Sequence, residues 1–167
     1  MKTFKLILSA LLLLATPAHA QFGFEGSGLI DVAAAEATYK GGITVLTGDV
    51  VVKQGDAIIT ADKMTIYREE TTNGTSSPKL GEITRIVAEG NFTYTAPENT
   101  VTGDRGIYKR SLKHIDVFGN VRLKQGDGNF VDSDSLFYDL TTRRARFKNE
   151  CSGPNCGRIN FGLNSNQ

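Results

Sequence analysis

The stretch that decides the fold is Leu46-Thr47-Gly48-Asp49-Val50-Val51-Val52, because the chain repeats its pattern twice more. The second copy is AEGNFTY at residues 88–94 and the third is VFGNVRL at residues 117–123. Each copy has a short apolar start, then Gly followed by Asp or Asn, then an alternating segment. A turn and a further segment that ends in tyrosine follow each copy. Repetition at this scale is typical of stacked β units.

Aligning the copies on their glycines shows which side chains share a face. The residues two before, two after and four after the Gly are apolar or aromatic in every copy, and a period of two places them on one side of their strands. The intervening residues are polar except for Val51. This pattern indicates antiparallel strands with one buried face and one wet face. The inward residues that we single out are Leu46, Val50, Val52, Ile86, Phe92, Tyr94, Val117, Val121 and Leu123.

Turn signals separate the strands. The sequences QGD at 54–56 and QGDG at 125–128 are typical of hairpins, and APEN at 96–99 takes the same place in the middle copy. The polar stretch 69–80 predicts a long exposed loop, after which strands resume at 82–87. No helix of convincing length is predicted. We therefore expect an all-β fold of about a dozen short strands, as a sandwich, a jelly roll or an open taco-like sheet.

The two ends of the chain do not follow the repeat. Residues 1–20 combine two lysines, a short apolar core and the cleavage sequence Ala18-His19-Ala20, as an export signal does. The apolar core is too short for a spanning helix, which disfavours an uncleaved anchor. We expect residues 21–167 to form a single exported domain, with Asn164–Gln167 as a disordered tail.

Cys151 and Cys156 enclose the turn-forming sequence SGPN. In an oxidising compartment we expect them to form a disulfide that closes a small loop. A redox pair usually has two residues between its cysteines, and a metal site would need further ligands. Both alternatives remain open on the residues alone.

Charge and side-chain chemistry narrow the classes of function. The 19 basic and 18 acidic residues are spread along the chain without a cationic arm, so no nucleic-acid partner is expected. No nucleophile elbow, phosphate loop or zinc spacing is present, and we predict no catalytic residue, cofactor or metal. His114 is expected on the polar face. Asp62, Asp104 and Asp134 recur at equivalent places, where we expect them to cap turns or strand ends rather than act as an acid–base pair.

Several runs resemble the LptA/OstA-like family of periplasmic lipopolysaccharide transport proteins. They are TGDVVVKQG at 47–55, ADKM at 61–64, FGNVRLKQG at 118–126 and DSLFYDL at 134–140, and the likeness extends from about Gly28 to Phe147. The resemblance implies an OstA-like β-jellyroll, slightly open along one side, in the periplasm. Its apolar interior would carry the acyl chains of lipopolysaccharide, with the nine inward residues as the lipid-binding set.

The resemblance also implies partners. In that family, subunits join edge to edge with each other, with an inner-membrane anchored bridge partner and with the outer-membrane translocon. For this chain it implies head-to-tail self-association, with Leu29–Thr38 and Arg143–Phe147 as docking edges. The loop between the cysteines departs from the family pattern. Five basic residues either meet lipid phosphates at the rim or form a solvated strand face; they are Lys53, Lys63, Arg85, Arg122 and Lys124.

Two alternative functions remain open. A structural or adhesive exported β-repeat protein would show the same alternation around a closed core. Another OstA-like module of the same transport system would share the fold and differ in its partners. An enzyme would need convergent polar groups in one pocket, and the sequence offers none. Whether the interior admits lipid separates a carrier from a structural protein.

Overall fold

The structure, a computed structural model, describes four parts of the chain: residues 30–69, 81–142, 144–150 and 157–164. The expected signal sequence, Cys151 and Cys156, nearly all of the expected 69–80 loop and residues 165–167 lie outside these parts. The described residues form ten strands: β1 Ile30–Ala33, β2 Glu36–Lys40, β3 Ile43–Gln54, β4 Ala57–Arg68, β5 Ile83–Ala96, β6 Asn99–Lys109, β7 His114–Gln125, β8 Phe130–Asp139, β9 Arg144–Lys148 and β10 Asn160–Gly162. None of the described segments is a helix with the length and apolar character needed to cross a membrane.

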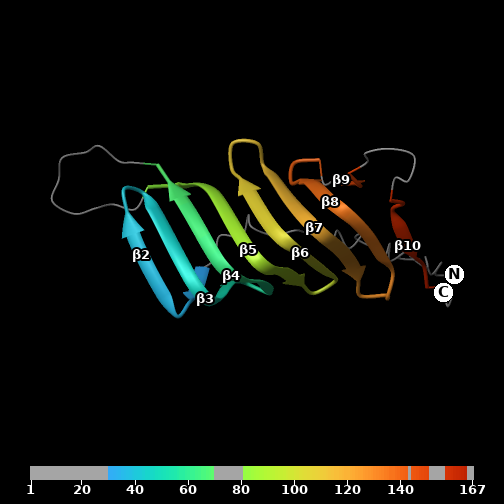
Figure 1. Ribbon diagram of the computed structural model, residues 1–167, viewed down its shortest axis with the longest axis horizontal. Helices are drawn as coiled ribbons and strands as arrows, with labels where there is room; N and C mark the ends of the chain where they lie inside the picture. The colour runs from blue at the N-terminus through green and yellow to red at the C-terminus, as the bar shows by residue number, and fades with distance from the viewer. Residues whose placement is uncertain (1–29, 70–80, 143, 151–156, 165–167) are drawn as a thin grey trace, which may run out of the picture.

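All ten strands belong to one antiparallel sheet in the order β1-β3-β4-β5-β6-β7-β8-β10 (Figure 1). From β3 to β8 each strand pairs with its neighbour in sequence. Two short strands share the outer edge of β3, because β1 pairs with one half of it and β2 with the other. In the same way β9 and β10 share the outer edge of β8. The sheet therefore has an N-terminal edge, made by β1 and β2, and a C-terminal edge, made by β9 and β10.

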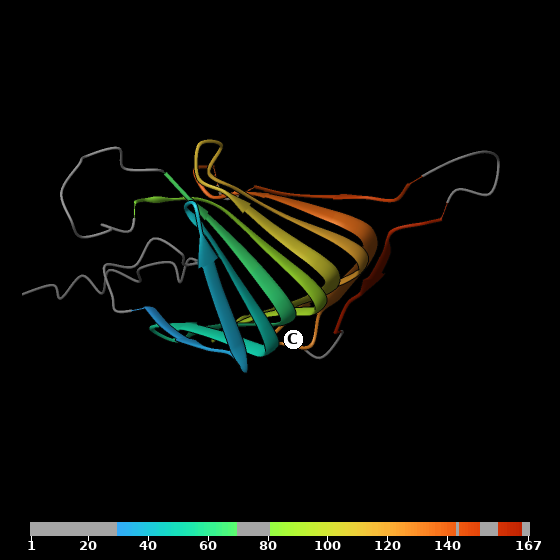
Figure 2. The ribbon, with the colours of Figure 1, turned by 60° about the vertical axis from the view of Figure 1, so that its left-hand side comes forward.

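Each long strand bends near its middle, so the single sheet folds into two facing walls (Figure 2). The first wall begins with β2, continues through one half of each strand from β3 to β8, and ends with β9. The second wall begins with β1, continues through the other halves of the same strands, and ends with β10. The expected all-β, jellyroll-like architecture is confirmed. The expected count of about a dozen short strands was wrong, because a strand that bends at a bulge continues around the corner instead of ending.

The bends coincide with the repeated Gly-Asp or Gly-Asn pair. At Gly90 and Asn91 both φ angles are positive, 76° and 49°, and the same holds for the pairs at 48–49 and 119–120. The strand register shifts at each pair, where two residues oppose one on the partner strand. Glycine and asparagine are the residues that tolerate this left-handed backbone at least cost. The sequence repeat is thus a repeated β-bulge.

The recurring aspartates lie opposite these bulges, which corrects their expected place at turns or strand ends. Asp62 accepts two hydrogen bonds from Asn91 Nδ2, at 3.1 and 3.0 Å. Asp104 accepts the same pair from Asn120, at 3.3 and 3.0 Å. The Asp134 carboxylate instead accepts the backbone N–H of Glu150. Asp62 and Asp104 therefore fasten their strands to the bend of a neighbouring strand, and Asp134 fastens β8 to the segment that follows β9.

Candidate functional site

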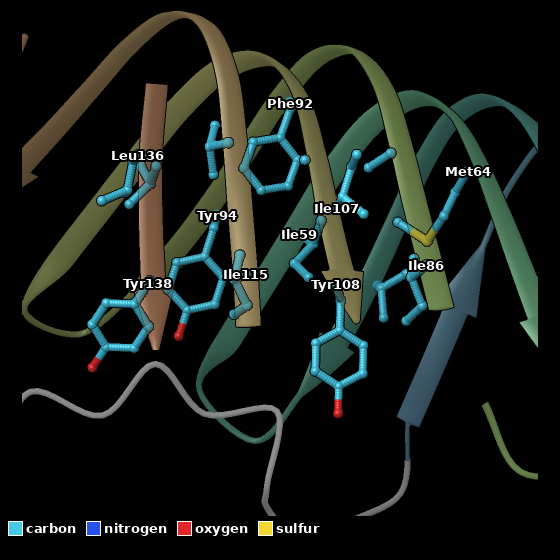
Figure 3. Close-up of a pocket in the computed structure, with 15 residues that line it drawn as sticks. Ile59, Met64, Ile86, Phe92, Tyr94, Ile107, Tyr108, Ile115, Leu136 and Tyr138 are labelled. Atoms are coloured by element: carbon cyan, nitrogen blue, oxygen red, sulfur yellow. The ribbon is translucent and has the colours of Figure 1, made fainter. Parts of the chain in front are cut away.

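A cavity lies between the two walls, and its lining is almost wholly apolar. The empty space among the lining residues is about 590 Å³ when the part open to solvent is included. The polar side-chain groups in the lining are three tyrosine hydroxyls, which point to the same side of the cavity (Figure 3). The lining residues are Val52, Ile59, Met64, Ile86, Ala88, Phe92, Tyr94, Val101, Gly106, Ile107, Tyr108, Ile115, Val117, Leu136 and Tyr138.

The lining residues form rows that run across the strands, along the axis of the roll. On the first wall, cross-strand pairing joins Met64, Ala88, Gly106, Val117 and Leu136 into one row. A parallel row contains Ile66, Ile86, Tyr108, Ile115 and Tyr138. On the second wall the corresponding row contains Val52, Ile59, Tyr94, Val101 and Leu123. Cross-strand neighbours lie in side-chain contact, so the rows make apolar stripes that run from strand to strand.

Phe92 crosses the interior from the second wall towards Gly106 on the first. A Cβ atom at Gly106 would come within 2.5 Å of the Phe92 ring, so the absence of a side chain there makes room for it. The ring is buried among the lining residues. Phe92 therefore sets the width of the interior at this point.

All nine residues of the predicted lipid-binding set contribute to the interior, although only part of the set lines the cavity. Val52, Ile86, Phe92, Tyr94 and Val117 do so. The other four, Leu46, Val50, Val121 and Leu123, pack within or against the same apolar cluster, and Val50 is fully buried. Their contact with lipid stays a prediction.

Sequence reasoning missed the lining residues of the second segment of each repeat, such as Met64, Leu136 and Tyr138. These strands do contain alternating apolar residues. However, the alternation changes face at the aspartate that lies opposite the bulge of the neighbouring strand. Ala61 and Met64 are both buried although they are three positions apart, because the bend at Asp62 turns two successive side chains outward. A period of two, continued through the bend, assigns this half of the strand to the wrong face.

The basic residues proposed for the rim lie at outward-facing positions, which favours the solvated strand face. Lys63 pairs with Glu89 at 3.9 Å, and Arg85 stacks 5.6 Å above the Tyr67 ring. Arg122 donates through Nε to Asp132 Oδ1 at 2.6 Å, and this hydrogen bond holds the pKa of the Asp132 carboxyl below its usual value. The remaining two, Lys53 and Lys124, are exposed.

Titratable groups are absent from the cavity lining apart from the tyrosines. His114 lies on the outer face, with Nε2 3.6 Å from Asp139 Oδ2. The buried carboxylate of Asp116 is also on the outer side, where Lys109 Nζ contacts its Oδ2 at 2.8 Å. Within the described ranges, no group of three or more His, Cys, Asp or Glu side chains is placed to hold a metal ion.

Both edges of the sheet expose apolar side chains. At the N-terminal edge these include Val32 and Tyr39, and at the C-terminal edge Phe161, which is 63 % exposed. β10, to which Phe161 belongs, was not predicted; it is only three residues long and carries no alternating pattern. Beyond it, Asn164 donates its backbone N–H to Asn129 Oδ1 at 2.7 Å.

Comparisons with known proteins agree with this geometry. The family model described as "LptA/(LptD N-terminal domain) LPS transport protein" matches residues 29–144. The fold is similar to the crystal structure of LptH from Pseudomonas aeruginosa, described as the LptA homologous periplasmic component of the conserved lipopolysaccharide transport device. That match has a TM-score of 0.63 at 21% sequence identity and covers 82% of this chain and 96% of LptH. A search of curated proteins gives no significant match.

Proposed function

Because this chain belongs to the family of LptA and the N-terminal domain of LptD, which are lipopolysaccharide transport proteins, we propose that it carries lipopolysaccharide across the periplasm within its folded sheet. The acyl chains occupy the cavity between the walls and pass along the apolar rows. The chain acts as a bridge between the inner and outer membranes and performs no catalysis.

The apolar cavity is the observation that carries this proposal. Transfer of a methylene group out of water is worth about 0.8 kcal/mol, so an acyl chain gains several kcal/mol by entering an apolar interior. The lining offers no charged group that would have to be desolvated. Rows that continue from strand to strand let a chain slide without leaving apolar contact.

We expect a photo-crosslinking residue at Tyr94 or Phe92 to form adducts with lipopolysaccharide, and the same residue at Thr93 to form none. Tyr94 and Phe92 line the cavity, whereas Thr93 lies between them on the opposite face. Crosslinking of the mature protein with purified lipopolysaccharide, followed by mass spectrometry, measures the difference. No labelling at Tyr94 and Phe92, or labelling at Thr93 alone, would favour a structural β-repeat protein with a closed core.

The two edges of the sheet support the proposal that the chain assembles into a bridge. Counted along either wall, the sheet has eight strands that alternate in direction. An even number means that β9 of one copy and β2 of the next run antiparallel, as do β10 and β1. Edge strands with unpaired backbone groups are natural sites for β-augmentation. We propose that copies join head to tail in this way, and that the inner-membrane anchored partner and the outer-membrane translocon use the same two edges.

The apolar rows set the register of this joint. Ala145 and Phe147 of β9 extend the rows of the first wall at its C-terminal edge, and Ala37 and Tyr39 of β2 extend them at its N-terminal edge. Rows that continue across the joint place Phe147 opposite Ala37 and Ala145 opposite Tyr39. In the same register, the outward-facing Lys148, next to Phe147, lies opposite the outward-facing Glu36, next to Ala37.

We expect Glu36→Lys to weaken self-association about two- to five-fold, because like charges directly opposite each other destabilise a strand pair by roughly 0.2–1 kcal/mol. Lys148→Glu should do the same, and the double exchange should restore association. Sedimentation velocity over a concentration series measures the effect. Asp56→Lys, the same charge change at an exposed turn, is the matched control. Weakening by each single exchange without rescue by the double exchange would reject this register.

A further inference from the structure

The mouth of the roll has two lips of different chemistry. The first lip is the border of the first wall. It contains the end of β4, the start of β5, the turn between β6 and β7, and the end of β8. The second lip is the border of the second wall, formed by the three hairpin turns at 54–57, 96–99 and 125–130. Both lips adjoin the cavity, so a ligand whose tails enter the cavity must leave its polar end between them.

On the first wall, the inward-facing apolar residues of two strands are followed by a basic residue at the border. Met64 and Ile66 are followed two residues later by Arg68 at the end of β4. After Gly106 and Tyr108 of β6, the next residue at this spacing is Arg110, which directly follows the strand. Two residues of strand correspond to about 6.5–7 Å, so each guanidinium-bearing residue begins one short step beyond the apolar rows.

The β6–β7 turn adds a third cation to the same lip. This cation is Lys113, which lies in the turn directly before β7 and has a positive φ of 50°. Backbone hydrogen bonds continue the strand register to these positions, from Arg110 N–H to the Thr84 carbonyl at 3.0 Å and from Leu140 N–H to the Lys113 carbonyl at 2.9 Å. β4, β6 and β7 therefore each have a basic residue at this border, and β5, which lies between β4 and β6, begins there next to Glu82.

These cations have capacity to bind an anion. Nε of Arg68 is buried and has no hydrogen-bond partner within the described ranges. Lys113 is exposed, and the ion pairs among the described residues do not include it. Arg110 contacts the Glu82 carboxylate, but both side chains are largely exposed, so a second anion can reach the guanidinium.

The second lip has the opposite character. Its three hairpins each carry one carboxylate, Asp56, Glu98 and Asp127. The inward-facing positions at this border are uncharged; they are Gln54, Ala57, Ala96, Asn99, Gln125 and Asn129. An anionic group at the mouth therefore meets basic residues beside Glu69 and Glu82 at the first lip, and uncharged inward-facing residues at the second.

We propose that the first lip, through Arg68, Arg110 and Lys113, binds the phosphate groups of the lipid headgroup and so orients the lipid in the roll. The assignment rests on the proposed function, because it needs the acyl chains in the cavity below. Guanidinium and ammonium groups form charge-assisted hydrogen bonds with phosphate oxygens. The hydroxyls of Tyr108 and Tyr138 lie in the adjoining row, between the apolar cavity and the cations.

The test compares two lipids and two charge-matched variants of the mature protein. The lipids are diphosphorylated lipid A and the same lipid A after enzymatic removal of its phosphates. The lip variant is Arg68→Gln/Arg110→Gln/Lys113→Gln. The control variant, Lys53→Gln/Arg105→Gln/Lys124→Gln, removes the same charge from exposed positions on the outer face. Affinities are measured at low ionic strength from the displacement of a fluorescent lipid probe by each lipid.

We expect the lip variant to bind diphosphorylated lipid A about ten-fold more weakly than the wild type, since each exposed ion pair contributes modestly. Its affinity for the dephosphorylated lipid should be unchanged, and the control variant should match the wild type with both lipids. Added salt should weaken binding of the diphosphorylated lipid by the wild type and have little effect on the lip variant.

Other outcomes overturn the assignment in distinguishable ways. Equal loss for both lipids would mean that the lip is structural, and no loss for either would mean that it binds no headgroup. A wild type that binds neither lipid would reject the proposed function itself. Inorganic phosphate bound by the wild type as tightly as the lipid would identify a free-anion site. If the partly buried Arg68 proves necessary for folding, Arg110→Gln/Lys113→Gln replaces the triple variant, with half or more of the effect expected.

Discussion

Ala88→Phe is expected to abolish capture of lipopolysaccharide while the roll stays folded. Ala88 lies in the lining of the cavity, in one row with Met64 and Gly106. A phenyl ring at this position would fill the space beside Phe92 that the small side chains leave open. Overpacking of a buried site costs about 1–3 kcal/mol, which a domain of ordinary stability tolerates.

The measurement is binding of lipopolysaccharide by the purified variant, together with its thermal unfolding. Thr93→Phe, which adds a ring on the outer face beside the cavity residues, is the matched control and should bind normally. A folded Ala88→Phe protein with wild-type affinity would show that the lipid does not pass between the walls. Loss of binding by both variants would point to a general effect of added bulk.

Gly90→Ala is expected to destabilise the protein by about 3 kcal/mol. Two effects combine at this bulge. The φ of 76° is unfavourable for any residue with a Cβ, at roughly 1–2 kcal/mol. A Cβ would also lie 2.2 Å from Asp62 Oδ2, so the carboxylate must move away from Asn91 and lose its hydrogen bonds.

Gly55→Ala separates the two effects. Gly55 has a φ of 57°, but a Cβ there would have no heavy atom within 4 Å, so only the backbone term of roughly 1–2 kcal/mol is expected. Urea unfolding of both variants measures the difference. Equal losses at the two positions would mean that the contact between Gly90 and Asp62 has no energetic role.

The inward face of the first strand of each repeat was predictable because its alternation is strong and begins anew after each Gly-Asp or Gly-Asn pair. Val50, Phe92 and Val121 are buried as the pattern requires. Inward residues were not assigned in the second strands, because the bend at their aspartate interrupts the alternation and this aspartate was expected at a turn or a strand end. A bulge changes the phase of a strand, and the phase is visible only when both paired strands are known.

Features that depend on how the walls face each other could not be predicted from the sequence. Arg68 and Lys113 lie far apart in the sequence, and only the register of β4 to β7 brings them to one lip. Gly106 reads as a weak position in a strand, whereas the structure shows that it makes room for Phe92. The resemblance to a family was informative about fold and function, and it carried no information about which inward residues line free space.

The order of the strands bears on how the protein reaches its native state. From β3 to β8 every strand pairs with the one that precedes it in the chain, so contacts span short stretches of sequence and the loop-closure entropy of each step is small. The sheet can therefore grow repeat by repeat along the chain. Each new strand is added to an edge already present, as in solenoid proteins. Folding of one molecule adds strands to an open sheet edge, and the proposed joint to the next molecule would form in the same way.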